Sequence, residues 1–240
     1  MADDRVVIVL FDIDGTLLTT GGAARQAFTR ALSEAAGRPI DPDGYSFSGR
    51  TDPQIARDIL TAAGVGGARL AAAIPETIRL YLKYFGAAAP RLRAARLLPG
   101  VRELLEALAA RPGARTALLT GNVEEGARLK LSCFDVTRFF DFSLSCFGSD
   151  DGDRYRLPAL ALERARRALG GTVRGRDLVL VGDSEHDVLC GRSVGARSVA
   201  VCTGWTSVEV LASHHPDAIL EDLSDTERAV ATILGVDEAA

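Results

Sequence analysis

Two aspartates one residue apart, Asp12 and Asp14, directly follow the apolar run at 6–11 and precede Gly15 and Thr16. Carboxylates this close repel each other and raise each other's pKa, so something must compensate the pair. In such a pair, one carboxylate can attack phosphorus and form an aspartyl-phosphate. The other can give a proton to the leaving oxygen and later take one from water. Taken alone, however, aspartates at the end of a strand are also common in turns.

Polar residues with the same placement end or follow two further apolar runs: Thr120, Gly121 and Asn122 at the end of 116–120, and Asp183 and Asp187 after 178–182. In open α/β sheets the ligand site lies beyond the carboxyl ends of the strands, so all these residues should meet in one crevice. Four carboxylates there would repel one another without a cation, and oxygen ligands without a His or Cys cluster point to Mg²⁺. Because Mg²⁺ keeps part of its coordination shell for substrate phosphate, the sequence predicts phosphoryl transfer.

The elements that must position these residues follow from the hydrophobic pattern. Continuous apolar runs predict strands buried on both faces of a parallel sheet, at 6–11, 116–120, 178–182 and 198–202. Helical patterns occur between and after them, at 101–111, 157–171 and 185–195. This alternation predicts an α/β fold class with a Rossmann-like, doubly wound parallel sheet.

The segment from 18 to 98 differs from the rest, because it shows helical patterns and no convincing strand. A crossover between neighbouring strands normally needs one helix, whereas this segment holds three patterns, at 24–37, 52–64 and 68–85. We therefore predict an inserted all-α cap domain at 18–98 and a catalytic core formed by 1–17 and 99–240. The insertion leaves the core directly after the aspartate pair, so we expect it to close over the site.

Composition and charge narrow the class of partner. A net charge of −4 and a pI near 5.5 give no reason to expect nucleic acid or an anionic membrane. No apolar stretch is long enough to span a bilayer, and the first residues lack the order of a signal peptide. The cysteines are scattered, so we expect reduced, mostly buried thiols in a cytoplasmic protein. The expected partner is a small phosphorylated metabolite, and the expected assembly is a monomer or a homodimer.

Four motifs resemble, in order, those of the haloacid dehalogenase-like hydrolases: DIDGT at 12–16, LLTGN at 118–122, an Arg before LPALALERA, and VGDSEHD at 181–187. The resemblance covers the whole chain, including a helical cap inserted directly after the first motif. The combination is specific, although each short string alone would be weak. It is closest to the helical-cap phosphatases of the phosphoglycolate phosphatase type and implies a Mg²⁺-dependent phosphoric monoester hydrolase.

The resemblance assigns roles to the strand-end residues. It makes Asp12 the nucleophile and Asp14 the general acid/base, which also lends its backbone carbonyl to the metal. Asp183 would complete the Mg²⁺ site, and Asp187 would act in the second coordination shell or through a water. Phosphoryl oxygens would be held by Thr120 and by the backbone of Gly121 and Asn122. Asp183 and Asp187 could also cap the helix that follows, and capping is compatible with metal binding.

The third motif departs from the commonest family pattern, which has a Lys, because no Lys follows residue 130. The segment GDRYRLPALALERA offers Arg154 and Arg156 instead. A guanidinium can bridge the nucleophile and the phosphate by binding two oxygens at once. We favour Arg154 as the catalytic residue, because a subset of the family has an Asp-Arg pair just before this helix.

In the cap, Arg50 is the residue that we most readily expect beside the substrate. Family caps often contribute a loop to specificity, and Arg suits an anionic ligand. A surface Arg without such a role is an equal alternative. Lys83, the only lysine of the cap, is better explained as part of a solvated helix face.

Three alternatives to a phosphatase remain open in the sequence. A sugar phosphomutase of the same family would share every core residue. Dehalogenases, which attack carbon without a metal, lack the second aspartate of the first motif, so Asp14 disfavours them, and phosphonate-cleaving relatives lack it too. A non-catalytic protein that binds a phosphorylated ligand would usually have lost the nucleophile or a metal ligand, and both are present here.

Overall fold

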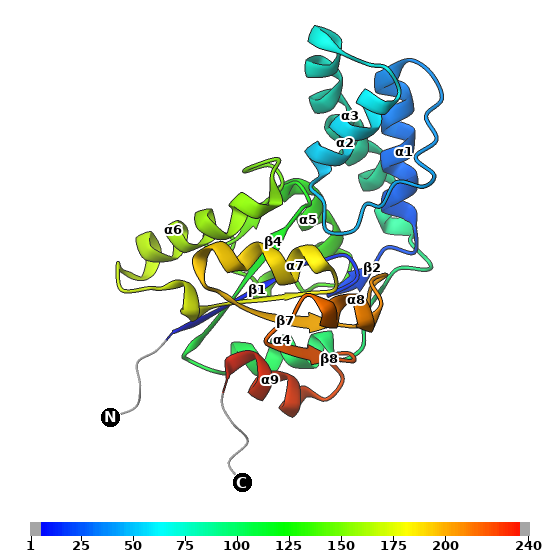
Figure 1. The fold of residues 1–240 in the computed structure, drawn as a ribbon. Coiled ribbons are helices and arrows are strands. Elements are labelled where there is room, and N and C mark those ends of the chain that lie inside the picture. Colours follow the sequence, from blue (N-terminus) through cyan, green and yellow to red (C-terminus); the bar gives the residue numbers. More distant parts are fainter. Residues whose placement is uncertain (1–5, 236–240) are drawn as a thin grey trace, which may run out of the picture.

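A six-stranded sheet lies at the centre of the computed structural model, which describes residues 6–235 (Figure 1). Its strand order is β5–β4–β1–β6–β7–β8, and all neighbouring strands are parallel. The strands are Val7–Phe11 (β1), Ala114–Thr120 (β4), Cys146–Phe147 (β5), Leu178–Gly182 (β6), Arg197–Val201 (β7) and Ala218–Leu220 (β8). The predicted α/β fold with a Rossmann-like parallel sheet is confirmed.

The position of β1 in the sheet explains why the site forms at its end. The strand pairs with β4 on one side and with β6 on the other, so Phe11 lies opposite both Leu118 and Val181. After β1 the chain builds β4 and β5 on one side of this strand, and it later returns to add β6, β7 and β8 on the other side. Ligands bind beyond the carboxyl ends of the strands at such a reversal of strand order.

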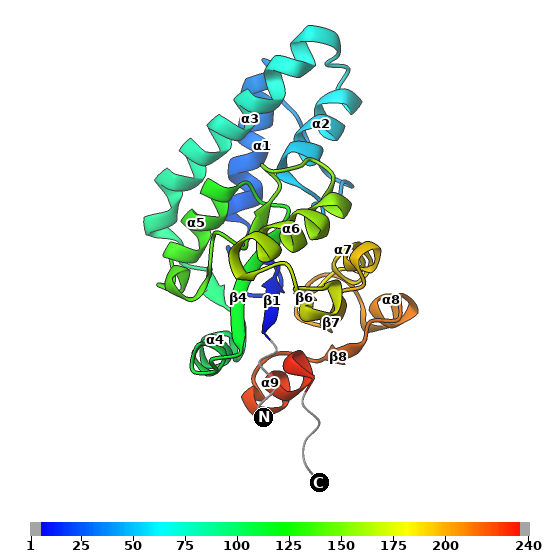
Figure 2. The same ribbon diagram turned by 90° about the vertical axis from the view of Figure 1, so that its left-hand side faces the viewer.

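Helices cover both faces of the sheet (Figure 2). Val9 and Phe11 of β1 pack against α4, α5 and α9, whereas Ile8 and Leu10 pack against α6 and Cys190 of α7. Because successive side chains of a strand point to opposite faces, the uninterrupted apolar run of β1 is buried on both. The helices on the two faces and edges of the sheet are Val101–Ala109 (α4), Glu124–Ser132 (α5), Leu157–Leu169 (α6), Glu185–Cys190 (α7), Val208–Ser213 (α8) and Thr226–Leu234 (α9).

Three helices form a separate layer beyond the carboxyl ends of the strands (Figure 1). They are Ala23–Ala36 (α1), Asp52–Ala62 (α2) and Gly67–Ala88 (α3). Their shared apolar cluster includes Phe28, Leu60, Tyr81 and Phe85 and is distinct from the clusters under the sheet. This layer is the segment that we predicted as a cap, and we refer to it as the predicted cap.

The expectation that 18–98 contains no strand was wrong in one detail. Leu18–Thr19 (β2) and Arg96–Leu97 (β3) pair antiparallel where the chain enters and leaves the predicted cap. A two-residue strand shows no periodicity in the sequence, and this pairing joins residues far apart in the chain. Short 3₁₀ turns complete the described elements, at Ala89–Arg91, Thr137–Phe139, Arg154–Arg156, Gly175–Asp177 and Gly191–Val194.

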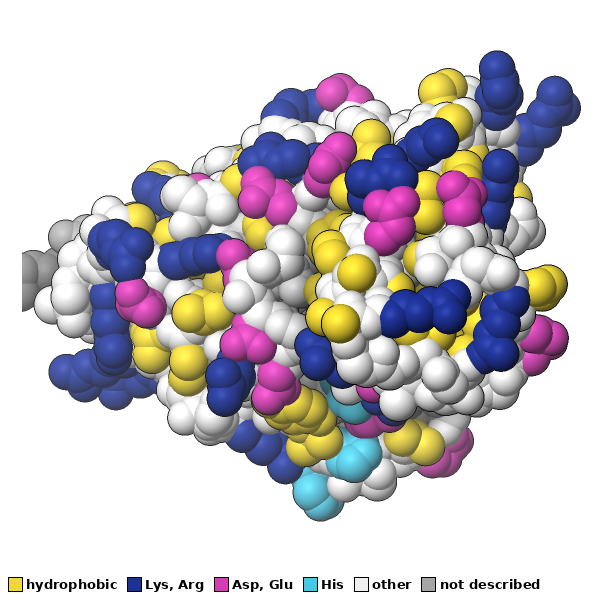
Figure 3. All heavy atoms as spheres, turned by 90° about the horizontal axis from the view of Figure 1, so that it is seen from above, with side chains coloured by type: hydrophobic (Ala, Val, Ile, Leu, Met, Phe, Trp, Pro, Cys, Tyr) yellow, Lys and Arg dark blue, Asp and Glu magenta, His cyan; other side chains and the backbone are white. Residues whose placement is uncertain are grey.

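The surface agrees with the balanced composition. In the view from above, basic and acidic side chains are interspersed, with apolar side chains among them (Figure 3). Within residues 6–235, no helix is both long enough and apolar enough to cross a membrane. Two of the cysteines, Cys146 and Cys190, are buried as expected, whereas Cys202 is half-buried and Cys133 is exposed.

Candidate active site

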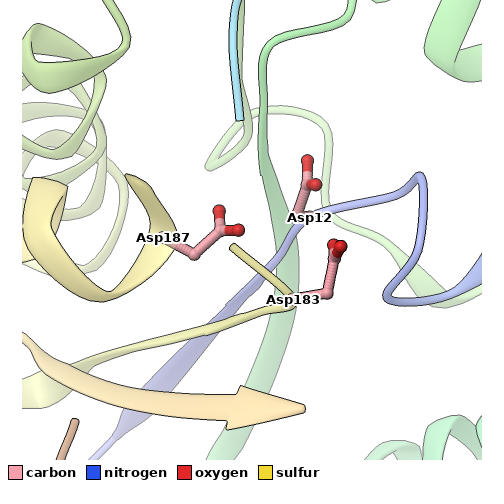
Figure 4. Close-up of side chains that lie close together, drawn as sticks. All are labelled: Asp12, Asp183 and Asp187. Atoms are coloured by element: carbon pink, nitrogen blue, oxygen red, sulfur yellow. The ribbon is translucent and has the colours of Figure 1, made fainter. Parts of the chain in front are cut away.

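Three carboxylates converge at the ends of β1 and β6 and the start of α7 (Figure 4). Asp12 directly follows β1, and its backbone N–H donates to the carbonyl of Val181 in β6 at 2.9 Å. Asp183 directly follows β6, and Asp187 lies in α7. The three side chains are buried, and one oxygen of each lies within 4.8 Å of the others. The structure thus brings together residues that are 175 positions apart in the sequence.

The guanidinium of Arg154 lies between two of these carboxylates. Its side chain is 3% exposed, its Nη2 is 3.4 Å from Oδ1 of Asp12, and the same nitrogen contacts Oδ1 of Asp187. Arg156, in the same 3₁₀ turn, is 73% exposed and pairs with Asp151 and Asp153 of its own loop. The structure therefore brings Arg154, and not Arg156, to Asp12.

Burial dominates the electrostatics of this cluster. It raises the pKa of Asp12 to about 6, an effect that the charge of Arg154 opposes and that of Asp187 reinforces. Burial and the charges of Asp187 and Asp12 raise the pKa of Asp183 well above its ordinary value, against a hydrogen bond from Thr16. The cluster thus holds more negative charge than one guanidinium offsets, and a further cation would stabilise its ionised form.

The surroundings of Asp183 fit a metal ion. The Thr16 hydroxyl donates to Oδ1 at 3.0 Å, while Oδ2 is buried and has no hydrogen-bond partner among residues 6–235. Two glycines line the same carboxylate, since a Cβ would lie 2.5 Å from Oδ2 at Gly15 and 1.6 Å from it at Gly204. Larger residues at these positions would fill the space beside the carboxylate. Hard oxygen donors with an unpartnered oxygen match the ligand preference of Mg²⁺.

Asp187 also caps the helix that contains it. The Ser184 hydroxyl is the N-cap of α7, and Oδ2 of Asp187 accepts a hydrogen bond from the backbone N–H of Ser184 at 3.0 Å. The capping expectation is therefore confirmed for Asp187 and wrong for Asp183, since Ser184 takes the N-cap position. Both oxygens of Asp187 already have donors, Arg154 and Ser184. This arrangement suits an indirect place beside a metal better than direct coordination.

The residues expected to hold phosphoryl oxygens lie at the end of β4. The Thr120 hydroxyl bonds to the side chain of Asp12 and also accepts from the backbone N–H of Asn122 at 3.3 Å. The amide nitrogen of the Asn122 side chain donates to Oδ2 of Asp14 at 3.0 Å. Thr120 and Asn122, with Gly121 between them, thus border the same crevice as the aspartate pair.

Lys130 is a site residue that the sequence analysis missed. It lies in α5, its side chain is 4% exposed, and its Nζ is 2.5 Å from Oδ2 of Asp14. Burial alone would lower its pKa, but Asp14, Tyr81 and Asp52 outweigh burial and raise it, so the ammonium stays charged. A signal was present: this is one of two lysines in a chain with 28 Lys and Arg residues, and it follows the motif that ends in Asn122.

The start of α2 in the predicted cap is bonded to two loops of the core. The Thr51 hydroxyl donates to the carbonyl of Gly152 at 2.7 Å. The backbone N–H of Asp52 donates to Gly121 at 2.8 Å, and Val123 donates its own N–H to Oδ2 of Asp52 at 2.8 Å. The predicted cap therefore contacts the loop that carries the expected phosphate-binding residues.

Asp52 leads to a prediction on stability and pH. Burial raises its pKa in the folded protein to about 6, with Lys130 opposing, whereas its ordinary value is 3.8. The folded protein thus keeps the proton over a range where the unfolded chain has lost it, so stability is lost as pH rises from about 4 through about 6. Asp52→Asn keeps an acceptor for Val123 and removes the titration. The difference in unfolding temperature, Asp52→Asn minus the unsubstituted protein, should therefore be larger at about pH 8 than at about pH 5. A difference that stays constant or decreases would contradict this assignment.

A cavity of about 660 Å³ lies between the predicted cap and the core loops. Asp12, Asp14 and Arg154 line it from the core, and Arg50 lines it from the predicted cap. The guanidinium of Arg50 lies 3.8 Å from Asp58, and its Nε is buried without a hydrogen-bond partner in the part of the chain that the structure describes. Gly121 and Asn122 also line the cavity, whereas Thr120, Asp183 and Asp187 are not among its lining residues.

A family model described as haloacid dehalogenase-like hydrolase matches residues 6–195. The matched range covers most of the chain and contains every residue of the acid cluster together with Arg154 and Lys130. It also contains the whole of the predicted cap.

Curated proteins match a shorter stretch. A pyrophosphatase PpaX from Oceanobacillus iheyensis is 35% identical over 57 residues, which is 24% of this chain and 25% of that protein. A phosphoglycolate phosphatase from Yersinia pseudotuberculosis is 28% identical over 58 residues, with the same shares. The matching stretch thus spans about a quarter of the length of these relatives.

A solved structure described as a predicted phosphoglycolate phosphatase from Haemophilus somnus aligns with a TM-score of 0.71 at 22% identity, over 96% of this chain and 100% of that one. At that identity the likeness shows the fold alone.

Proposed function

The chain belongs to the haloacid dehalogenase-like hydrolase family, and from this membership we propose that it is a Mg²⁺-dependent phosphatase of small phosphomonoesters. The observation that carries the proposal is the guanidinium of Arg154 between Asp12 and Asp187, inside a buried acid cluster at the strand ends. A phosphoryl group bound there would meet a nucleophile and a fixed positive charge at once. The phosphatase names of the relatives support the same class of reaction.

In the first half of the proposed reaction, the carboxylate of Asp12 attacks phosphorus and displaces the substrate oxygen, which leaves an aspartyl-phosphate. Arg154 offsets the charge of the phosphoryl oxygens, and Thr120 with the backbone of Gly121 and Asn122 binds them from the β4 side. Asp14 gives its proton to the leaving oxygen.

In the second half, Asp14 takes a proton from water, and the resulting hydroxide attacks phosphorus and frees Asp12 and phosphate. Lys130 and Asn122 both donate to Oδ2 of Asp14. Oδ1 is therefore the oxygen that we propose as the carrier of the proton. In this scheme Lys130 is a positioning residue, because it acts on the substrate only through Asp14.

Mg²⁺ would be held by Asp12, Asp183 and the backbone carbonyl of Asp14, with Asp187 acting through a water or through Arg154. When bound, the ion neutralises the carboxylates and the phosphoryl oxygens, so that nucleophile and phosphate can approach each other. The buried Oδ2 of Asp183, which has no hydrogen-bond partner among the described residues, and the adjacent Gly15 and Gly204 support this site.

The predicted cap, residues 18–98, would exclude water while the aspartyl-phosphate forms and open to release the product. The bonds from Thr51 and Asp52 to the core loops support a closed position of the cap, and in this proposal the short β2–β3 pair acts as the hinge. We further propose a small phosphorylated metabolite as substrate, with no nucleic-acid or membrane partner, and a cytoplasmic monomer or homodimer.

The proposal is tested by measuring phosphate release in Mg²⁺ from sugar phosphates, phosphoglycolate, nucleoside monophosphates and a chromogenic aryl phosphate. Turnover of at least one compound is expected, with complete loss in chelator and recovery when Mg²⁺ is restored. Mg²⁺ should also raise the unfolding temperature, because it binds the folded state. As a matched control, Asp183→Asn should remove most of that rise.

Turnover that continues in chelator would contradict the metal-dependent mechanism. Conversion of a sugar phosphate into its isomer, without release of free phosphate, would instead identify a phosphomutase. Both outcomes are read from the same reactions.

A further inference from the structure

The cavity above Asp12 is larger than a two-carbon phosphate requires. Its volume of about 660 Å³ lies within the range of sites that hold drug-sized ligands. The phosphoryl group would occupy only the end at Asp12 and Arg154. The rest of the cavity is available to the leaving group, and its walls determine which leaving groups fit.

Trp205 lines this cavity, although 89% of its side chain is exposed. It follows β7 and is the only tryptophan of the chain. An isolated exposed apolar residue is ordinary. Here, however, an exposed tryptophan ring lines the cavity that Asp12 and Arg154 also line, so it offers a ligand a large apolar face.

The backbone that carries Trp205 is fixed against the acid cluster. The Thr203 hydroxyl donates to the carbonyl of Gly15 at 2.6 Å. Gly204 packs on the carboxylate of Asp183, because a Cβ there would lie 1.6 Å from Oδ2. Residue 205 is therefore tied to the loop that follows the nucleophile. A ring on a fixed backbone loses less entropy when a ligand stacks on it than a ring on a loose loop would.

The residues of the predicted cap that line the cavity supply flat and hydrogen-bonding groups. The guanidinium of Arg25 stacks over the ring of Phe47 at 4.4 Å and bonds to the backbone carbonyl of Pro42 at 3.1 Å. Arg50 carries the unpartnered Nε, and its charge is already offset in part by Asp58. These guanidinium groups can donate hydrogen bonds to acceptor atoms on a flat ring.

We propose that the substrate is a phosphomonoester whose leaving group carries a flat heteroaromatic ring, as in a nucleoside 5′-monophosphate, and that Trp205 stacks on this ring. This inference rests on the proposed phosphatase function and adds to it a class of leaving group. Trp205 acts as a specificity-determining residue, since it contacts the ring and not the reacting phosphorus.

The test compares adenosine 5′-monophosphate with ribose 5-phosphate, which has a hydroxyl at the anomeric carbon in place of the base, on the full-length enzyme in Mg²⁺. We expect kcat/KM to be about tenfold higher for the nucleotide, because stacking a base on an aromatic side chain contributes that much or more. Trp205→Ala should bring the ratio of the two kcat/KM values to about one, while Trp205→Phe should keep most of the advantage of the nucleotide. Val208→Ala is the matched control, because Val208 is a neighbouring exposed apolar residue outside the cavity wall.

Binding is measured separately through the fluorescence of the single tryptophan. In Asp12→Asn, which is not expected to turn over substrate, adenosine 5′-monophosphate should quench the fluorescence in a saturable way and ribose 5-phosphate should not. Absence of quenching up to about 1 mM nucleotide would overturn the inference.

The two proposals fail in different ways. Equal kcat/KM for the nucleotide and ribose 5-phosphate, or an unchanged ratio in Trp205→Ala, overturns the ring-stacking inference and leaves the phosphatase standing. Phosphate release from none of the compounds, including phosphoglycolate, contradicts the proposed phosphatase itself.

Discussion

Asp12→Asn is expected to lower phosphate release by about four orders of magnitude or more, because an amide cannot form the aspartyl-phosphate. The substitution keeps the shape of the side chain and removes a charge that burial disfavours, as the raised pKa of Asp12 near 6 indicates. The unfolding temperature of the variant without Mg²⁺ should therefore equal or exceed that of the unsubstituted protein. Turnover of the best substrate and thermal unfolding followed by circular dichroism measure the two effects.

Asp41→Asn, at an exposed position away from the cavity, is the matched control and should retain full activity. Acid quenching during turnover of a substrate labelled at phosphorus should leave label on the unsubstituted protein and none on Asp12→Asn. Activity of Asp12→Asn within about tenfold of normal would show that another group attacks phosphorus.

Arg154→Ala is expected to lower kcat/KM by about a hundredfold to a thousandfold, because it removes the fixed positive charge beside the attacking oxygen. It should also destabilise the protein by about 3–5 kcal/mol, since it leaves the buried carboxylates of Asp12 and Asp187 without their shared cation. Steady-state kinetics in Mg²⁺ and urea unfolding measure the two losses.

Arg156→Ala, two residues away on the same turn, is the matched control and should change both quantities little, because its guanidinium is exposed. Arg154→Lys should recover part of the stability but less of the activity, since an ammonium lacks the planar fork of a guanidinium. A larger loss in Arg156→Ala than in Arg154→Ala would show that the third motif uses the other arginine.

The long elements could be predicted because their signals are local. β1 is buried on both faces, so its sequence is a continuous apolar run. The helices α1, α2 and α3 each bury one face and are long enough for the apolar residues to recur with helical periodicity. The strands that were missed are short, and the helices α5, α8 and α9 were not predicted either. β2, β3 and β5 have two residues each, so only pairing with a distant segment defines them.

The residues of the candidate site likewise fall into those that could be predicted from the sequence and those that only the packing of the fold reveals. The placement of Asp12 and Asp183 at strand ends follows from order in the sequence, because a parallel sheet brings the carboxyl ends of its strands to one edge. Lys130 lies inside α5, where the helical pattern does not distinguish a lysine on a solvated face from one buried against Asp14, and only the rarity of lysine in the chain singles it out. Only the packing of α5 against the loop after β1 brings the two together.

The sequence by itself determined the fold class and the set of acids, because hydrophobic periodicity and the spacing of polar residues at strand ends are properties of neighbouring positions. Tertiary structure decided which of two arginines reaches Asp12, which lysine contacts Asp14, and that Trp205 lines the same cavity as Asp12. These choices depend on side-chain burial and on contacts between segments far apart in the chain. Such contacts form only when the sheet and the predicted cap are assembled, so no local pattern records them.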